Sequence, residues 1–210
     1  MAESLALTRY DGPAPRAAVL LAHGAGAGQR SPFMVALGRG FAQRGVAAAT
    51  FDFPYMAARR RVPDRAPVLE AAWREAIAAG RTAFGSLPLL AAGKSMGGRI
   101  ASQVAAGGGV GPLAGLVFFG YPLHPPGRPD QRRDAHLPQI GEPMLFVQGE
   151  RDAFGTADEI GALLPSLTRA TLHVVAGGDH SLKASRRAQA DTLNEALDAA
   201  CAWIDDLLGA

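Results

Sequence analysis

Ser95 has the sequence surroundings of a serine nucleophile. It lies in the pattern Gly-x-Ser-x-Gly at residues 93–97, directly after the apolar run Leu89–Ala92 and before a stretch rich in small residues. A strand, this pattern and a helix hold a serine on a sharp, strained turn, and the small glycines let the turn close. Such a serine attacks a carbonyl carbon when a base takes its proton. The rest of the chain should therefore supply a base, an acid that orients the base, and donors for an oxyanion.

The predicted acid and base are Asp152 and His180. Each follows an apolar run, and sites in open parallel sheets form at the carboxyl ends of the strands. The chain order Ser, Asp, His is the order typical of one class of triad hydrolases. Glu150 and Asp179 are the rival acids, although Asp179 fits better as the cap of a local turn.

The remaining histidines and the first glycine-rich turn have other predicted roles. His23 precedes a turn with glycines at positions 24, 26 and 28, and we expect it to organise that turn. The backbone N–H groups of Ala25 and Met96 are the predicted oxyanion donors. His173 lies within a predicted strand, which favours a structural role, and His136 lies in an irregular loop.

Alternating apolar runs and helical patterns predict the elements that position these residues. The predicted strands are Ala17–Ala22, Val46–Phe51, Leu89–Ala92, Leu116–Phe119, Met144–Val147 and Leu172–Val175. The predicted helices are Ser31–Arg44, a segment from Leu69 to Phe84 with Trp73 on its core face, Met96–Ala106, and a closing helix from Leu193 to Leu207. Continuous apolar strands are typical of a parallel sheet covered on both faces. We therefore expect a single three-layer α/β domain over residues 1–210, with a mostly parallel sheet and no large cap domain.

Two nucleotide-binding motifs are disfavoured. Gly93-Lys94-Ser95 matches the end of a phosphate-binding loop, but the position that needs the first glycine is Pro88. The glycines at positions 24, 26 and 28 do not have the spacing of the dinucleotide fingerprint. No histidine, cysteine and carboxylate cluster has metal-ligand spacing, so we expect neither a cofactor nor a metal.

Composition indicates an ordinary globular protein. The 210 residues are 48% hydrophobic and 19% charged, with a net charge of +2, which gives little reason to expect a nucleic-acid partner. Cys201 is the only cysteine, so no internal disulfide forms, and we expect it to be buried. Neither a signal peptide nor a membrane span is evident, so we expect a cytoplasmic protein. The oligomeric state is left open.

Three segments make the chain similar to a known family. They are Phe51–Tyr55, Gly93–Arg99 and Gly120–Gly127. With the triad order, they resemble the α/β-hydrolase superfamily over nearly the whole chain, and more narrowly a compact branch related to dienelactone hydrolase that includes the testis-expressed hydrolase-like proteins. The resemblance implies a hydrolase fold and site. Dienelactone hydrolase uses a cysteine nucleophile where this chain has Ser95, so its substrate is not carried over.

These observations together predict a serine hydrolase that cleaves an ester or thioester of a small acyl substrate. The alternative is a non-catalytic interaction module that keeps the fold. The predicted substrate contacts are His23, Tyr55, Tyr121 and His124. The long irregular segment Tyr121–Gly141 is expected to cover part of the site. The loop arginines Arg59–Arg61, Arg128, Arg132 and Arg133 are either a solvated surface or a site for an anionic substrate or partner.

Overall fold

A seven-stranded sheet forms the centre of the computed structural model, which describes residues 5–209. Its strands are β1 (Thr8–Tyr10), β2 (Ala17–Ala22), β3 (Val46–Phe51), β4 (Leu89–Lys94), β5 (Gly115–Phe119), β6 (Met144–Gly149) and β7 (Ala170–Val175). They lie in the order β1-β3-β2-β4-β5-β6-β7, and all neighbours are parallel except β1 and β3. The carboxyl ends of β4, β6 and β7 therefore meet at one edge of the sheet.

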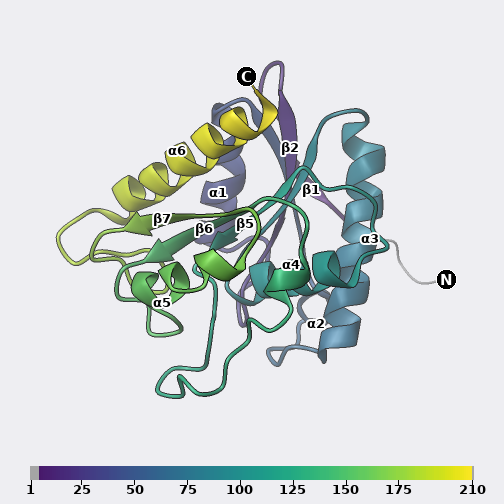
Figure 1. Cartoon of the computed structure of the whole chain (residues 1–210). Coiled ribbons are helices and arrows are strands. Elements are labelled where there is room, and N and C mark those ends of the chain that lie inside the picture. The colour runs from purple at the N-terminus through teal and green to yellow at the C-terminus, as the bar shows by residue number, and fades with distance from the viewer. Residues whose placement is uncertain (1–4, 210) are drawn as a thin grey trace.

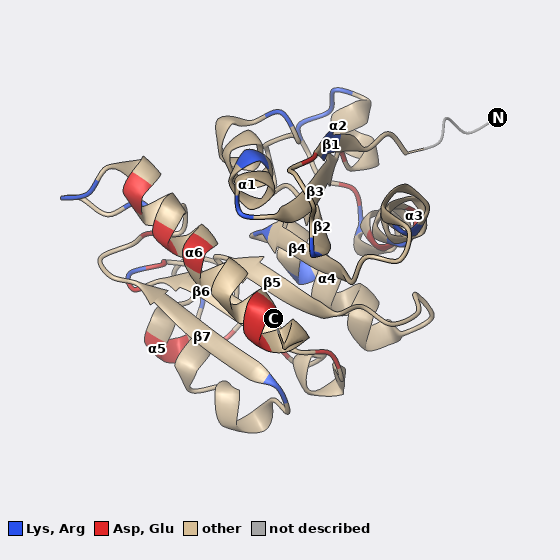
Figure 2. Ribbon diagram, turned by 90° about the horizontal axis from the view of Figure 1, so that it is seen from above, with Lys and Arg blue, Asp and Glu red and all other residues tan. Residues whose placement is uncertain are grey.

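Helices cover both faces of this sheet (Figure 1). The α-helices are α1 (Pro32–Gln43), α2 (Pro54–Ala57), α3 (Ala66–Phe84), α4 (Met96–Gly107), α5 (Ala157–Gly161) and α6 (Gln189–Leu208), with 3₁₀ turns at Leu137–Gln139 and Leu164–Ser166. Helices α1 and α6 pack on one face, and α3 and α4 pack on the other. The view from above in Figure 2 shows the same division.

The central strands explain why two separate cores form. In β2, Ala18, Leu20 and Ala22 pack with the α3 and α4 side, while Val19 and Leu21 pack with the α1 and α6 side. Successive side chains of a strand point to opposite faces, so a strand covered on both sides must be apolar throughout. The predicted three-layer α/β fold with a mostly parallel sheet is thus confirmed, and no separate cap domain is present in the described part of the chain.

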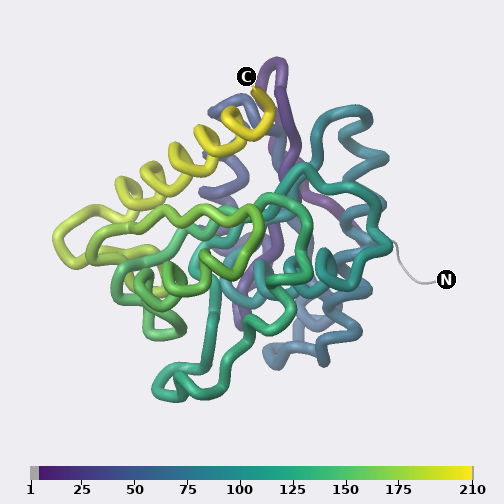
Figure 3. Tube along the Cα trace, in the orientation of Figure 1, coloured from purple at the N-terminus to yellow at the C-terminus, as the bar shows by residue number. Residues whose placement is uncertain are grey.

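The predicted strands and long helices are present, and the short elements are the ones missed. Strand β1 and helices α2 and α5 have too few residues to show a clear period. Strand β7 is at an edge and is only partly buried, unlike the central strands. The segment after β5 extends away from the body of the molecule, as the teal-green trace near residue 130 in Figure 3 shows, although its first residues, Tyr121 to His124, are buried.

Ion pairs attach the closing helix α6 to the rest of the fold. Acidic residues follow its length in Figure 2, and Asp198 accepts from Arg44 at 2.7 Å, while Asp205 pairs with Arg16. The opposite side of α6 is apolar and includes Cys201, which is buried as predicted. Within residues 5–209, no helix combines the length and apolar character needed to cross a membrane.

Candidate active site

Ser95 occupies a strained backbone turn between β4 and α4. Its φ of +51° lies in the left-handed region that side chains rarely adopt, and its N–H donates to the Phe119 carbonyl at 3.1 Å. The neighbouring glycines are required by close backbone contacts. A Cβ on Gly93 would lie 2.3 Å from the Gly98 nitrogen, and one on Gly97 would lie 2.4 Å from the Ala22 oxygen. The turn therefore presents the hydroxyl above the carboxyl edge of the sheet.

His180 lies between Ser95 and Asp152 in a continuous chain of hydrogen bonds. Its Nε2 is 2.8 Å from the Ser95 Oγ, and its Nδ1 is 2.8 and 2.9 Å from the two Asp152 carboxylate oxygens. A carboxylate only accepts, so Nδ1 carries the proton and Nε2 is free to accept from the serine hydroxyl. This is the protonation pattern that a general base needs.

Asp152 is fully buried and its carboxylate accepts two further hydrogen bonds. Gln148 Nε2 donates to Oδ2 at 2.9 Å, and the Phe154 N–H donates to Oδ1 at 2.8 Å. The Phe154 ring packs against the His180 imidazole with centroids 4.1 Å apart. These contacts fix the carboxylate and the imidazole in one orientation. Gln148 and Phe154 were not predicted, because no sequence motif distinguishes either residue.

The rival acids lie elsewhere. Glu150 is exposed and accepts from the Gly177 N–H at 2.6 Å. Asp179 Oδ1 accepts from the N–H groups of Ser181 and Lys183 at 2.8 and 3.0 Å, which is the turn-capping role predicted for it. Asp152 is thus the carboxylate that contacts His180 in the described part of the chain.

The two predicted oxyanion donors border the serine. Ala25, Ser95 and Met96 line one small cavity, and neither the Ala25 nor the Met96 N–H donates to another protein group within residues 5–209. Met96 is the first residue of α4, where the helix leaves its N–H without an internal partner. Both amides are therefore free to donate to an oxygen that develops negative charge beside Ser95.

His23 holds the turn that carries Ala25. Its Nδ1 donates to the Gly24 carbonyl at 2.9 Å, and its Nε2 accepts from the Phe53 N–H at 3.1 Å. Burial lowers the pKa of this imidazole, which keeps the ring neutral as these two contacts require. His23 thus organises the turn, as expected, and it does not reach the substrate side.

The other three residues predicted to contact the substrate lie away from the cavities beside Ser95. Tyr55, Tyr121 and His124 are buried and do not line the cavities beside Ser95. The Tyr121 hydroxyl donates to the Arg133 carbonyl at 2.8 Å, and His124 Nε2 lies 3.1 Å from Glu159. Buried polar tips normally find partners, and those of Tyr121 and His124 lie in the segment after β5 and in α5, whereas the Tyr55 hydroxyl is buried without a partner among the described residues.

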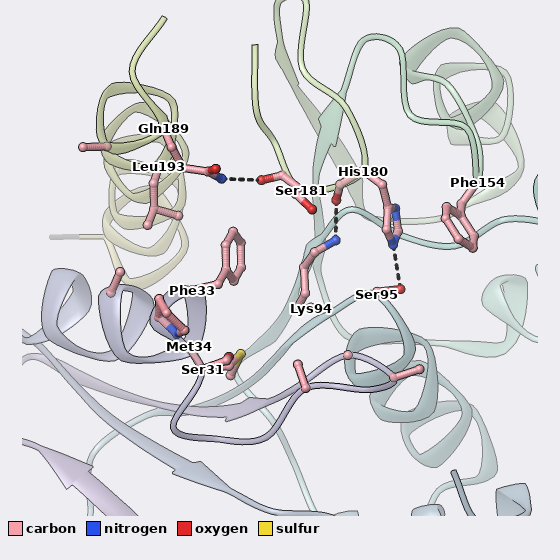
Figure 4. Close-up of a pocket in the computed structure, with 16 residues that line it drawn as sticks. Ser31, Phe33, Met34, Lys94, Ser95, Phe154, His180, Ser181, Gln189 and Leu193 are labelled. Atoms are coloured by element: carbon pink, nitrogen blue, oxygen red, sulfur yellow. Dashed lines mark hydrogen bonds between the residues drawn. The ribbon is translucent and has the colours of Figure 1, made fainter. Parts of the chain in front are cut away.

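A large cavity opens on the α1 and α6 side of Ser95. Its volume is about 750 Å³, and Figure 4 shows that Phe33, Met34 and Leu193 form its apolar wall. The cavity runs from Ser95 and Phe154 to the start of α6 at Gln189. A cavity of this size and character suits a drug-sized apolar group.

Lys94 is a second feature that the sequence did not reveal. Its side chain reaches across the cavity wall, between Phe33 and His180, and its Nζ donates to the His180 carbonyl (Figure 4). Burial is the main cause that lowers the pKa of Lys94 to about 8. Lys94, which occupies the lysine position of the partial phosphate-loop match, therefore holds the loop that carries His180.

The loop arginines are mostly solvated. Arg59, Arg61 and Arg128 are exposed, and Arg132 pairs with Asp134 at 2.6 Å. Arg133 is partly buried and lines the small cavity. The described residues contain no group of three histidine, cysteine or acidic side chains arranged to hold a metal ion.

Comparisons with solved structures give the same fold at low sequence identity. A dienelactone hydrolase from Anabaena variabilis superposes with a TM-score of 0.75 at 20% identity, with 96% of this chain and 91% of that chain covered. A serine hydrolase homologue from Coxiella burnetii gives 0.71 at 15% identity, covering 95% and 89%. Est1E from Butyrivibrio proteoclasticus, solved with ferulic acid bound, gives 0.70 at 15% identity, covering 98% and 97%.

The sequence also matches a known family over most of its length. Residues 15–208 match the family described as "Alpha/beta hydrolase domain". The match spans the sheet from β2 to β7, all six helices, and Ser95, Asp152 and His180. It confirms the predicted superfamily, and the fold shared with a dienelactone hydrolase agrees with the predicted branch. The chain belongs to the α/β-hydrolase domain family.

Proposed function

We propose that the protein is a serine hydrolase that cleaves esters or thioesters of small acyl substrates. The observation that carries this proposal is the unbroken hydrogen-bond chain from the strained Ser95 through His180 to the buried Asp152. A structural serine in a turn needs neither the strain nor the base. The free amides of Ala25 and Met96 beside the same hydroxyl add the donors that acyl transfer requires.

The proposed reaction has two halves. Ser95 Oγ attacks the substrate carbonyl while His180 Nε2 takes the hydroxyl proton, and the Ala25 and Met96 N–H groups stabilise the oxyanion. Collapse of this intermediate releases the alcohol or thiol, which receives the proton from His180, and leaves an acyl group on Ser95. Water then attacks the acyl-enzyme with His180 again as base, which releases the acid and restores Ser95. The chain's own groups and water complete every step.

Covalent labelling tests the nucleophile directly. The intact protein should react with a fluorophosphonate probe, and Ser95→Ala should abolish the label while keeping the melting temperature. Ser86→Ala is the matched control, because Ser86 is exposed in the turn before β4, at the opposite edge of the sheet. An intact protein that takes up no label beside a reactive control hydrolase would favour the alternative, a non-catalytic interaction module.

A substrate panel separates esters from thioesters. We expect Ser95-dependent turnover of p-nitrophenyl esters and acyl-thioesters, with the preferred acyl length set by the large cavity. The panel should be run with Ser95→Ala as the blank. Turnover that is equal in the blank would show that the hydrolysis does not use this site.

A further inference from the structure

A second cavity lies on the other side of Ser95. It has a volume of about 280 Å³ and shares Ala25, Ser95 and Phe154 with the large cavity. Its remaining wall comes from the α3 and α4 side of the sheet, including Asp64, Met96, Arg99 and Arg133. The reacting hydroxyl thus lies between two cavities, so a bound ester can place one half in each.

Arg99 is a partly buried cation that makes few hydrogen bonds through its guanidinium group. Its Nε is buried with no hydrogen-bond partner, and its Nη1 reaches only Gln103 Oε1, at 3.4 Å. Burial first, and then the nearby charge of Arg133, lower the pKa of Arg99. A buried cation normally has an anion or a full set of acceptors, because desolvating an unpaired charge is costly. The Arg99 guanidinium therefore keeps hydrogen-bonding capacity that the described residues do not use.

Asp64 is the carboxylate that lines the same cavity, and it does not neutralise the arginines. Its Oδ1 accepts from Arg60 at 2.7 Å, and its Oδ2 is buried without a partner. Among the described residues, no acidic side chain forms an ion pair with Arg99 or Arg133. The small cavity is therefore lined by two arginines and by one carboxylate that another arginine already binds.

We propose that Arg99 and Arg133 bind a carboxylate carried by the ester substrate, while the apolar half of the substrate fills the large cavity. This inference rests on the proposed hydrolase function and narrows its substrate class. Two guanidinium groups offer paired N–H donors that match the two oxygens of a carboxylate. The ligand chemistry expected at this site is thus a short, charged acid group on an otherwise apolar ester.

The volume of the small cavity limits the length of the charged half. Ser95 and Arg99 line the same cavity of about 280 Å³, so only a short spacer fits between the reacting carbonyl and the carboxylate. This volume is less than half that of the large cavity. The carboxylate belongs either to the acid half or to the alcohol half of the ester, and both arrangements place it beside Ser95.

Two pairs of substrates distinguish these arrangements. Monohexyl glutarate carries the carboxylate on the acid half, and γ-(hexanoyloxy)butyrate carries it on the alcohol half. Each is compared with its neutral primary amide, and the readout is the ratio of the two kcat/KM values, measured by chromatography of the released products. We expect the wild-type ratio to favour the carboxylate by about tenfold or more in one pair, the effect of a charge-assisted hydrogen bond.

Single substitutions then assign the preference to the two arginines. Arg99→Gln and Arg133→Gln should each lower the ratio towards one, and using a ratio cancels any general loss of turnover. Arg128→Gln is the matched control. Arg128 is exposed on the same loop as Arg133, and its substitution removes the same charge. Arg133 is partly exposed, so its variant keeps the test valid if Arg99→Gln fails to fold.

A pH comparison excludes Lys94 as the carboxylate ligand. The pKa of Lys94 is about 8, so its charge is lost as the pH rises to about 9, whereas arginine keeps its charge. A preference that persists at about pH 9 belongs to the arginines, and one that disappears there overturns the proposal. A ratio near one in both pairs, or a ratio unchanged in both arginine variants, also overturns it. In those cases, Ser95-dependent hydrolysis of the neutral esters would leave the proposed hydrolase function intact. If no ester is hydrolysed in a Ser95-dependent way, both the hydrolase function and the carboxylate site are contradicted.

Discussion

The two cavities that meet at Ser95 differ in size, chemistry and origin. The large one is walled mainly by apolar side chains of α1 and α6, and the small one combines apolar side chains with Asp64, Arg99 and Arg133. The α3 and α4 side therefore adds arginines to the site, and the α1 and α6 side adds a larger apolar surface. Each wall can be changed without touching the other, because the sheet separates the two layers.

The shared residues differ from both walls. Ser95, Ala25 and Phe154 border both cavities, and they belong to the turns at the carboxyl edge of the sheet. Changes in the shared part should affect every substrate alike, while changes in one wall should affect only substrates that fill it. Substitutions of the two kinds therefore distinguish effects on the chemical step from effects on substrate specificity.

The largest effect is expected for the shared machinery, with Asp152→Asn. The amide would favour the wrong imidazole tautomer, so kcat should fall by about ten-thousandfold for substrates that fill either cavity. Steady-state kinetics on the two substrate pairs measure this. Glu150→Gln is the matched control, since Glu150 lies two residues before Asp152 and its exposed carboxylate accepts from the Gly177 N–H. An equal loss in both variants would contradict the assignment of Asp152.

A smaller effect is expected for Lys94→Met. The substitution keeps the bulk beside Phe33 but removes the donor to the His180 carbonyl, so kcat should fall by about tenfold to a hundredfold, with KM changed less. Lys183→Met is the control, because Lys183 is the chain's other lysine and is exposed. A change in KM alone would show that Lys94 acts on the substrate and does not position His180.

Filling one cavity at a time should give a still smaller and selective effect. Ala190→Phe adds bulk at the rim of the large cavity, where Ala190 is exposed, and should lower kcat/KM for long acyl chains by about tenfold. Ala66→Phe adds the same bulk to the small cavity and should lower the carboxylate preference. Both variants are assayed on chain-length and carboxylate series. Identical effects of the two variants would mean that the cavities do not bind separate parts of a substrate.

The smallest effect is expected on the stability of the fold at low pH, through His23 in the turn that carries Ala25. Burial holds the folded-state pKa of His23 below its unfolded value, so the unfolded chain binds the extra proton. The stability contribution is therefore present above about pH 6.5 and is lost as the pH falls. Denaturant unfolding at several pH values should show this fall. His23→Gln should reduce the fall in unfolding free energy with decreasing pH. The fall that remains should come from His136, because burial also lowers the pKa of that imidazole.

Much of the fold and the three main site residues were predictable because they depend on local patterns. The runs Ala17–Ala22 and Val46–Phe51 are apolar throughout since helices cover both faces of the sheet, and the structure places strands there. Ser95 was evident from glycines that the backbone contacts require. Asp152 and His180 followed from their positions after late strands, because parallel strands bring their carboxyl ends together.

The loop residues were not predictable in the same way. Tyr121 and His124 have the composition of substrate-contacting residues, yet both turn inward and contact Arg133 and Glu159. The direction of a side chain in an irregular segment depends on what packs against it from distant parts of the chain. Arg99 was not predicted to contact the substrate, yet it lines the small cavity. Its position in the serine motif indicates only the start of a helix.

The sequence by itself determined the layered sheet, the strained serine turn and the chain order of Ser95, Asp152 and His180. These follow from apolar periodicity, glycine sterics and chain direction, which are properties of short segments. Only the tertiary structure decided that Lys94 holds a carbonyl 86 residues away, and that Arg99 and Arg133 face one cavity while Phe33 and Leu193 line the other. Such contacts join residues distant in the chain, and their geometry is set by how whole helices pack on the sheet.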